Sequence, residues 1–545
     1  MSEHLTNEDK RMMRIMQDPV TWAETHLNQK PRWYQEQALR HPHNRIALRW
    51  GRRLGKCIAE GQTLVNADTG ELMKVEDLVN NPVRTHSLDN AYQLKKEDMY
   101  GVEENGLKPV YEITLNNGTS VELTKNHPVL TFSGWKEVQD IDVGDSIATP
   151  SVIPVFGDLN PREEYVKTLA YLSFAKLLSD KGPMIKVYVH EHRRFIEETL
   201  KSCDVDTFPK NSQSSYILDK NKQFEKILMT EDVYIPEEVF QYTREKMAMF
   251  IASAFDARGY VDLSKSSEIN FTLNDKYVAN QMKHLLLRFG IESSLRTKTS
   301  KGYTTYYTRI HHKVDISKFI EIIGKYSLKD YSESVEMLEN TKNYGKMLPV
   351  IASEYVTKEL KKQGKTVAGM KKTMTNPNLF RKNGGIAREA AFEIADYLED
   401  GFLHDMSLAD ISWKEVKSIE DIGEKMTYDV LMPRFHNLIV EDIYVHNTWT
   451  MVAHMLWAAF TNMGGKKKDG GTICVVAVPY DKQANLIYRE LRKQIEANDI
   501  LANSVKTMKQ SPYTIEFKNT SEIRIFTTGA KTSSGGASIR GQAAD

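Results

Sequence analysis

Two segments far apart in the chain read as one motif that a long insertion has separated. Residues 45–50 favour a strand, the loop after it ends in Gly55-Lys56, and Thr448 would follow directly if residues 57–447 were removed. A strand, a glycine-containing loop that ends Gly-Lys-Thr and a helix are together typical of a phosphate-binding loop. The two flanks must therefore fold together as one domain, while the insertion folds as a separate body inside it.

The residues at the two ends of the insertion carry the chemistry of peptide-bond rearrangement. The insertion begins with Cys57 and ends with His446-Asn447, and Thr448 comes next. A peptide bond is inert at neutral pH, so breaking it needs a nucleophile, a proton for the leaving amine and donors for the tetrahedral oxyanion. The Cys57 thiol can attack the preceding carbonyl, the Thr448 hydroxyl can take over the acyl group, and the Asn447 amide can cyclise onto its own carbonyl. This pattern indicates an insertion that removes itself and joins its flanks.

Three segments of the insertion resemble the sequence blocks of inteins, which are self-excising protein insertions. Residues 57–65 resemble the first block, and residues 118–130 resemble the second, with its Thr-x-x-His. Residues 428–440 resemble the penultimate block, with one departure, because Leu438 stands where the family often has Phe. The resemblance implies an all-β, horseshoe-like splicing domain of the Hint type that needs no cofactor for splicing.

The same resemblance implies a role for each polar residue in these blocks. In the second block, the threonine helps to hold the strained scissile bond, and the histidine protonates the departing amine of the first inserted residue. In the penultimate block, the aspartate tunes the attacking thiol and the histidine assists asparagine cyclisation, while the last histidine of the insertion polarises the asparagine carbonyl. The predicted splicing residues are Cys57, Thr124, His127, Asp429, His436, His446, Asn447 and Thr448.

Composition and turn signals divide the chain into several bodies. The charges balance, with 73 basic and 73 acidic residues, and the three cysteines form no CxxC pair, so neither a disulfide framework nor a thiolate zinc site is indicated. The sequence has no long apolar run and no secretory signal, so we expect no membrane and a cytosolic setting. Short strands alternate with turn signals before residue 155 and again after Trp413, which predicts one interrupted β domain. The expected domains are 1–56, 57–157, 158–404, 405–447 and 448–545.

The stretch from about residue 158 to residue 404 favours helices mixed with strands. Residues 165–180 and 244–257 each predict an apolar helix, followed by a strand and a second, amphipathic helix. Two copies of this α-β-α pattern suggest an internal repeat. The lysine-rich residues 326–404 predict further helices, and their sequence indicates no role.

The first helix of each copy resembles a signature helix of LAGLIDADG homing endonucleases, in residues 169–182 and 250–261. In that family each helix ends in an acid, just before a glycine, that binds the divalent metal used in phosphodiester hydrolysis. Aligned on the closing glycines, these positions hold Lys181 and Arg258, which cannot ligate Mg²⁺. Only Asp180, one position away, offers a weak substitute as a metal ligand. We therefore predict a folded α+β endonuclease-like domain with impaired catalysis, which would need Mg²⁺ for any activity.

A predicted hairpin in the second copy combines basic and aromatic residues. Such a β-ribbon can reach into a major groove, so double-stranded DNA is the expected partner, and an ordinary solvated hairpin is the alternative. The residues concerned are Arg296, Lys298, Lys301, Tyr303, Tyr306, Tyr307, Arg309 and Lys313.

The flanks carry a shortened variant of the phosphate-binding loop. Trp50 stands where the first glycine is usual, and residues 51–55 form an arginine-containing loop. With residues 31–35 upstream, this pattern resembles the large terminase subunit of tailed bacteriophages, and another P-loop ATPase, such as a helicase, is the alternative. The resemblance implies a fragment of an α/β ATPase that binds ATP and Mg²⁺ only after the flanks are joined. The nucleotide-binding residues would be Gln35, Gly51, Arg52, Gly55, Lys56 and Thr448.

The terminase resemblance also implies partners and a location for the host enzyme. Terminases use ATP to drive viral DNA into a procapsid, so a procapsid portal, a small terminase subunit and double-stranded DNA are expected, in the cytoplasm of an infected bacterial cell. The chain reaches Asp545 before any strand with the paired acids of a Walker B site, so we expect an incomplete motor. The predicted function is that of an autocatalytic splicing precursor. The alternative is a homing endonuclease or DNA-binding module that sits in an ATPase without efficient splicing.

Overall fold

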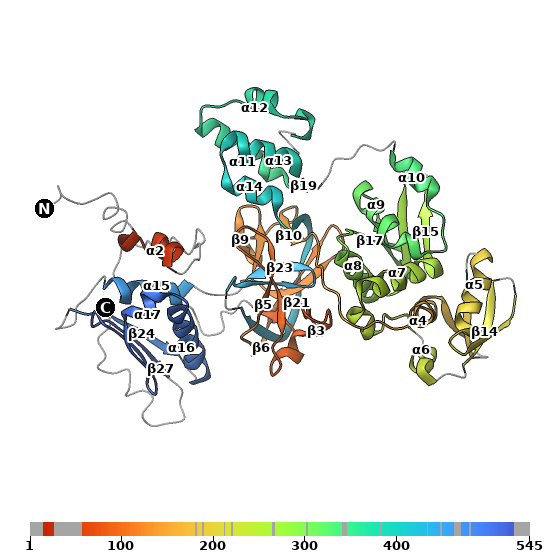
Figure 1. Ribbon diagram of the computed structural model, residues 1–545, viewed down its shortest axis with the longest axis horizontal. Coiled ribbons are helices and arrows are strands. Elements are labelled where there is room, and N and C mark those ends of the chain that lie inside the picture. The colour runs from red at the N-terminus through yellow and green to blue at the C-terminus, as the bar shows by residue number, and fades with distance from the viewer. Residues whose placement is uncertain are drawn as a thin grey trace. The chain divides into compact units, whose positions relative to one another are not determined.

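The computed structural model divides the chain into two compact units. One unit is Gly55–Asn447, and the other combines Met1–Leu54 with Thr448–Asp545. Three bodies with separate hydrophobic cores make up the first unit: a β domain (57–150 and 411–446), a repeat domain (163–339) and a helical domain (346–408) (Figure 1). The structure describes residues 15–26, 57–179, 182–187, 190–211, 213–219, 222–230, 232–263, 267–300, 303–339, 346–380, 384–432, 434–446, 450–462, 470–478 and 481–527.

The β domain is built around two long antiparallel strands that come from opposite ends of the insertion. β6 (Gly101–Leu115) and β21 (Ile411–Leu431) pair along most of their length, and the ladder has three register shifts. Such irregularities bend a strand and let it serve two parts of one sheet. Accordingly, β21 pairs with β10 (Ser146–Pro150) near its start and with β1 (Ile58–Ala59) near its end.

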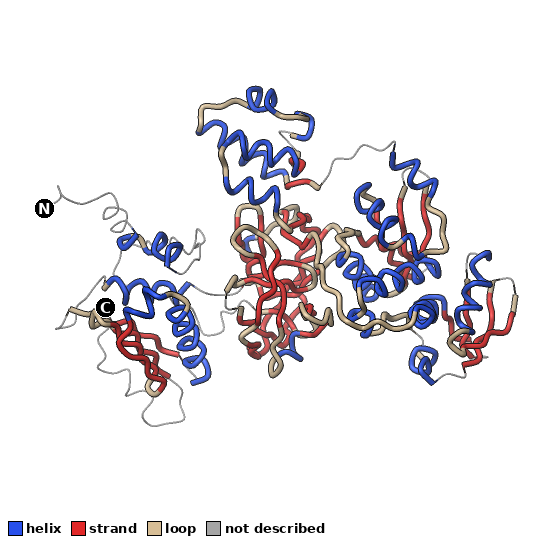
Figure 2. Tube along the Cα trace, in the orientation of Figure 1, coloured by secondary structure: helices blue, strands red, loops and turns tan. Residues whose placement is uncertain are grey.

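The sheet has nine strands in all, and the domain is almost entirely strand and loop, as expected (Figure 2). The other members are β7 (Ser120–Thr124), β8 (Pro128–Thr131), β9 (Gly134–Glu137), β22 (Asn437–Val440) and β23 (Ile443–His446). The strand order is β1-β7-β6-β21-β10-β8-β23-β22, with β9 paired to β8. Two small hairpins flank it, β2 (Thr63–Val65) with β3 (Leu72–Lys74) and β4 (Arg84–Leu88) with β5 (Leu94–Asp98).

The turn between β6 and β7 shows how a local signal fixes the register. Gly118 has φ +79° and its amide donates to the carbonyl of Leu115, which closes the turn. A left-handed backbone of this kind suits glycine because it has no Cβ. A Cβ at Gly118 would also lie 2.5 Å from Cβ of Leu295, so the turn packs tightly against the repeat domain.

The repeat domain contains two copies of an α-β-β-α-β-β pattern, so the expected internal repeat is confirmed and is longer than predicted. The first copy is α4 (Glu163–Ala175), β11 (Lys176–Ser179), β12 (Gly182–Lys186), α5 (His190–Lys201), β13 (Val205–Pro209) and β14 (Ser214–Asp219). The second is α7 (Arg244–Arg258), β15 (Gly259–Asp262), β16 (Glu268–Leu273), α8 (Lys276–Arg288), β17 (Ser294–Ser300) and β18 (Tyr303–Ile310). Their sheets have matching orders, β11-β12-β14-β13 and β15-β16-β18-β17.

The end of the first signature helix differs from the prediction. α4 ends at Ala175, and the next four residues form β11, so the expected helix through residue 180 or 182 is wrong. Lys176 causes part of this difference, because its buried ammonium donates to the carbonyls of Ile227 and Thr230. Gly182 has φ +108° and opens β12 instead of closing a helix. The leucines after Lys176 suit a strand as well as a helix, so the apolar pattern alone could not separate the two.

The helical domain has its own core and packs on the β domain. Its elements are α11 (Val350–Lys362), α12 (Val367–Thr373), α13 (Arg388–Leu398) and α14 (Gly401–Leu408), with a short pair β19 (Met347–Leu348) and β20 (Ile386–Ala387). Phe132 of the β domain joins this core, and its ring lies 5.3 Å from that of Phe402. Among the described residues, no helix is long and apolar enough to cross a membrane.

The second unit, called the flank domain, surrounds a separate core that includes Trp22, Tyr488 and Leu491. Its helices are α2 (Pro19–His26), α15 (Thr450–Thr461), α16 (Asp481–Glu496) and α17 (Asp499–Ser504). Its strands are β24 (Ile473–Val478), β25 (Val505–Gln510), β26 (Tyr513–Phe517) and β27 (Glu522–Thr527), in the order β24-β27-β26-β25. The β24–β27 pair is parallel, as expected for α/β architecture, whereas the other two pairs are antiparallel.

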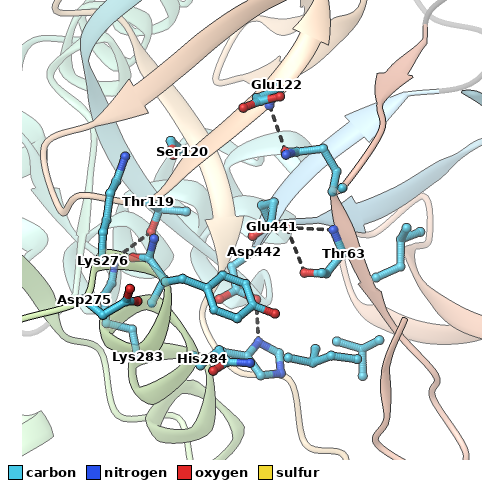
Figure 3. A pocket seen from close by; sticks show the side chains of 18 of the residues that line it. Thr63, Thr119, Ser120, Glu122, Asp275, Lys276, Lys283, His284, Glu441 and Asp442 are labelled. Carbon is cyan, nitrogen blue, oxygen red and sulfur yellow. Dashed lines mark hydrogen bonds and ion pairs between the residues drawn. The ribbon is translucent and has the colours of Figure 1, made fainter. Parts of the chain in front are cut away.

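A buried charged network joins the repeat domain to the β domain. Arg288, the last residue of α8, is fully buried and donates to the carbonyls of Gly70 and Phe240 and to Nε2 of His284. Because Nε2 of His284 accepts this bond, Nδ1 carries the proton and donates to Oδ1 of Asp442 at 2.8 Å (Figure 3). Burial opposes ionisation of Asp442, but His284, Lys283 and Arg288 together hold its pKa below the ordinary value.

Asp442 and its neighbour Glu441 form the turn between β22 and β23, and both have positive φ, at 58° and 46°. The Glu441 carboxylate accepts bonds from the amide and hydroxyl of Thr63, at 2.6 and 2.8 Å. A cavity of about 520 Å³ adjoins these residues and is lined also by Asp275 and Lys276 of the repeat domain (Figure 3). Burial raises the pKa of Glu441 to about 7, although the bonds from Thr63 oppose that shift.

The raised pKa of Glu441 predicts a stability that depends on pH. An acid whose pKa is higher in the folded state loses stability as pH rises from its ordinary value of 4.5 to its folded value of about 7. Glu441→Gln removes this loss and keeps an acceptor for Thr63. We expect the variant to have a higher melting temperature than the parent at pH 8 and an equal one near pH 4.5, measured by calorimetry.

The exposed Glu420→Gln supplies the control, because its carboxyl is not buried. It should leave the melting temperature unchanged at both pH values. A Glu441→Gln variant that melts no higher than the parent at pH 8 would contradict the assignment of a destabilising, partly buried carboxylate.

Candidate functional site

The strand register brings the two ends of the insertion to one turn. Ile58 pairs with Leu123 on one side and with Tyr428 on the other, so Cys57 lies between Thr124 and Asp429. β23, which ends at His446, pairs with β8. The strands β7 and β8 are joined by the turn that carries Thr124-x-x-His127. A single turn therefore contacts the start of the insertion and leads into the strand beside its end.

The predicted second-block residues contact the backbone of Cys57 directly. The amide of Cys57 donates to Oγ1 of Thr124 at 3.1 Å, and the amide of Thr124 donates to the carbonyl of Cys57 at 3.1 Å. Nδ1 of His127 lies 3.2 Å from the same carbonyl oxygen. The Thr124 hydroxyl thus touches the Cys57 nitrogen, which must leave in the first step. The His127 imidazole contacts the carbonyl of the same cysteine.

The sulfur of Cys57 is fully buried and has two donors that the sequence did not reveal. Nδ2 of Asn105 and Nζ of Lys108 each lie 3.0 Å from Sγ. Burial raises the pKa of the thiol, and the negative charge of Asp429 raises it further, whereas Lys108 lowers it. Both donors come from a kink in β6 at Gly106, whose φ is +76°. A glycine inside a strand pattern was the one available signal, since it often marks a bend.

The C-terminal end of the insertion is enclosed by aromatic and polar groups. His446 is buried, and its ring lies 4.9 Å from that of Trp135 in an edge-to-face arrangement. Asn437 stands opposite His446 in the β22–β23 ladder and exchanges bonds with the backbone of Leu88. His436 precedes it with a left-handed backbone, at φ 54°. Trp135 was not predicted, because its contact depends on the pairing of distant strands.

Several predicted site residues lie outside the described residues. These are Asn447 and Thr448 at the second junction, Lys56 at the first, the loop residues Gln35, Gly51, Arg52 and Gly55, and Asp180 and Lys181 of the endonuclease-like region.

The described helix ends of the repeat domain carry cations where acids were sought. Arg258 is the last residue of α7 and donates to the carbonyl of Phe174, while Lys176 directly follows α4. Lys176 therefore replaces Lys181 as the residue at the first helix end. Asp256 accepts bonds from Ser327 and the amide of Leu328, so it points into the domain. In the described ranges no group of three His, Cys, Asp or Glu residues is placed to hold a metal ion.

The predicted basic ribbon exists as the hairpin of β17 and β18, but some of its members have other roles. Arg296 and Lys298 are exposed on β17, opposite Tyr307 and Thr305. Arg309 forms an ion pair with Glu268 on the neighbouring strand. Lys313 begins α9 (Lys313–Ile322) and so does not belong to the ribbon. Arg309 lies on β18 as expected, whereas the placement of Lys313 in the ribbon was wrong because the helix start is not visible in the hairpin pattern. Lys301 lies outside the described residues.

The chain is similar in sequence to two kinds of curated protein. It is 25% identical to the replicative DNA helicase DnaB of Nostoc sp. over 65% of this chain and 45% of that protein, and 22% identical to the protein RecA of Mycobacterium tuberculosis over 72% and 56%. The chain thus spans about half the length of these curated relatives.

Solved structures with partial similarity include a DnaB intein from Synechocystis sp. and the N-terminal LAGLIDADG domain of WhiA. The first is 24% identical, with a TM-score of 0.17, over 18% of this chain and 70% of that chain. The second is 15% identical, with a TM-score of 0.23, over 31% and 86%. These scores are low, so the assignment rests on the family model of the intein splicing domain, which matches residues 64–447. Because this match covers most of the chain, the chain belongs to the intein splicing domain family.

Proposed function

We propose that residues 57–447 excise themselves and join Lys56 to Thr448. The observation that carries this proposal is the placement of Cys57 between Thr124 and Asp429, on the turn that leads to the strand beside His446. A site that contacts both ends of an insertion can act on both junctions without a large movement.

The reaction begins when Sγ of Cys57 attacks the carbonyl carbon of Lys56. A sulfur–carbon bond forms, the carbon–nitrogen bond breaks, and His127 gives a proton to the departing nitrogen of Cys57. Thr124 holds that nitrogen through its hydroxyl, at 3.1 Å. A leaving nitrogen that is already held in place lowers the barrier, because less ordering is needed when its proton arrives.

The remaining steps exchange and release the acyl group. The hydroxyl of Thr448 attacks the thioester and expels the Cys57 thiolate, which gives a branched ester. The side-chain nitrogen of Asn447 then attacks its own backbone carbonyl, so that the bond to Thr448 breaks and a succinimide forms. We assign His446 to polarise that carbonyl and His436 to assist the cyclisation. A final oxygen-to-nitrogen acyl shift leaves a normal peptide bond, and no cofactor takes part.

The host is proposed to be a P-loop ATPase of the terminase type. The support is the joined sequence Gly55-Lys56-Thr448 after an arginine-containing loop. ATP and Mg²⁺ would bind at Gln35, Gly51, Arg52 and these three residues only after splicing. DNA, a procapsid portal and a small terminase subunit in an infected bacterial cell are the partners and setting that this host implies. A helicase-type host is the alternative, and it leaves the splicing proposal unchanged.

A second candidate function is DNA binding by the repeat domain without efficient splicing. The exposed Arg296 and Lys298 on β17 favour a contact with nucleic acid phosphates. The cations at the helix ends, Lys176 and Arg258, disfavour metal-dependent cleavage, because both repel Mg²⁺.

Substitution of the two junction residues tests the splicing proposal. We expect the parent chain to yield a free insertion and a ligated flank product, seen on a denaturing gel under reducing conditions. Cys57→Ala should abolish the ligated product, and Asn447→Ala should stop release of the insertion after the first steps. A parent chain that stays intact for hours and behaves like both variants would refute self-excision.

The nuclease prediction requires a separate assay. With Mg²⁺ and a DNA segment that encodes the uninterrupted flanks, we expect retarded DNA mobility without strand cleavage, and the binding constant should fall with added salt because phosphates are contacted. Arg296→Ala together with Lys298→Ala should weaken the retardation, whereas the exposed Lys417→Ala in the β domain should not. Robust cleavage by the parent chain would show that the helix-end cations do not prevent metal binding.

A further inference from the structure

The nucleophilic sulfur occupies a position that is unfavourable for its reactive form. The thiolate is the attacking species, and a buried thiolate has lost the water that would stabilise it. Cys57 is 0% exposed, and Asp429 places a negative charge near it. The first splicing step therefore needs a positive or hydrogen-bonding partner at the sulfur to offset both effects.

Among the described residues, Lys108 is the only cation that bonds to this sulfur. Its Nζ lies 3.0 Å from Sγ, and Nδ2 of Asn105 lies at the same distance. From the other elements, Asp429 on β21 raises the pKa of the thiol and the Thr427 side chain lowers it, while Nδ1 of His127 contacts the Cys57 carbonyl.

The neighbouring lysine on β21 provides an instructive comparison. Lys425 stands opposite Lys108 in the β6–β21 ladder, but its ammonium is paired with Oε2 of Glu122 at 2.6 Å. Within the described residues, no carboxylate forms such a pair with Lys108. Two lysines on adjacent strands thus differ, because one is neutralised by an acid and the other directs its charge at the sulfur.

We propose that Lys108 is a catalytic residue of the first splicing step, holding the Cys57 sulfur as a thiolate while Asn105 fixes its direction. This inference rests on the proposed splicing function. Water accepts the thiol proton, and Lys108 acts through its positive charge without transferring a proton. The sulfur then forms its bond to the Lys56 carbonyl carbon, the carbon–nitrogen bond breaks, and the amine receives its proton from His127, so that one proton is released and one is taken up.

The first step can be isolated in the full chain by combining Asn447→Ala with Thr448→Ala. In this background the thioester forms but cannot proceed, so added dithiothreitol cleaves the chain at the first junction and the cleavage rate reports thioester formation. Failure of the proposed function would appear as no cleavage in this background at all, whereas failure of the Lys108 inference would leave cleavage intact and insensitive to the substitution.

Lys108→Met removes the charge and keeps the length of the side chain. We expect cleavage at pH 7 to slow by about tenfold for each unit by which the thiol pKa rises, and the deficit to shrink as pH rises, because hydroxide then generates the thiolate. Lys108→Arg should restore most of the rate, and Lys108→Gln should show the same pH displacement as Lys108→Met. The exposed Lys417→Met on β21 is the matched control and should cleave like the background chain.

The second readout is the pH dependence of alkylation at Cys57, measured by mass spectrometry of the modified peptide. The midpoint should move to higher pH in Lys108→Met and return in Lys108→Arg. A rate loss that is equal at every pH, with an unmoved alkylation midpoint, would overturn the proposal and leave Lys108 as a structural residue. An unchanged rate would overturn it as well. If Lys108→Met does not fold, as judged by circular dichroism, the same criteria apply to Lys108→Gln and Lys108→Arg.

Discussion

The antiparallel pairing of β6 with β21 is the constraint on which the rest of the insertion depends. It joins a strand from the start of the insertion to one from its end, although the repeat and helical domains lie between them in sequence. The same strand β21 carries the register that places Asp429 beside Cys57. At its other end Ile411 pairs with Pro150 of β10, so the chain leaves the β domain and returns to it at neighbouring positions. A strand spacing of about 5 Å is all that the inserted domains must span, which explains how the sheet tolerates them.

The repeat domain is nevertheless fixed to the β domain by buried charge. Arg288, His284 and Asp442 form one chain of bonds from the end of α8 to the turn before β23. Removing one partner of such a buried network typically costs about 3–5 kcal/mol, because the remaining charge loses its compensation. β23 ends at His446, so the repeat domain anchors the hairpin that leads to the second junction. The domain therefore supports the splicing site whether or not it cleaves DNA.

Local patterns in the sequence predicted much of this architecture. The helix from Arg244 and the interrupted β domain follow from apolar periodicity and turn signals, and they agree with the structure. The end of α4 was mispredicted because Lys176 is stabilised by the carbonyls of Ile227 in α6 (Glu225–Met229) and of Thr230 just after it.

The site was predictable where its chemistry is local and unpredictable where it depends on register. Cys57 and the Thr124-x-x-His127 turn could be recognised by residue type and position, and the structure brings them together. The approach of Lys108 to the sulfur depends on a kink in β6, and the burial of Arg288 depends on the carbonyls of Gly70 and Phe240, which lie in separate segments. Such contacts join residues that are remote in sequence, so no short sequence pattern predicts them.

The most direct test of the account is the intact mass of the expressed chain after incubation in reducing buffer. Self-excision predicts two species, an insertion that starts at Cys57 and ends in a succinimide at Asn447, and a single polypeptide that contains both flanks joined from Lys56 to Thr448. The joined polypeptide is decisive, because simple cleavage at both junctions would release the flanks as separate fragments. A spectrum with only the full-length chain, or with unjoined flanks, would contradict the central claim.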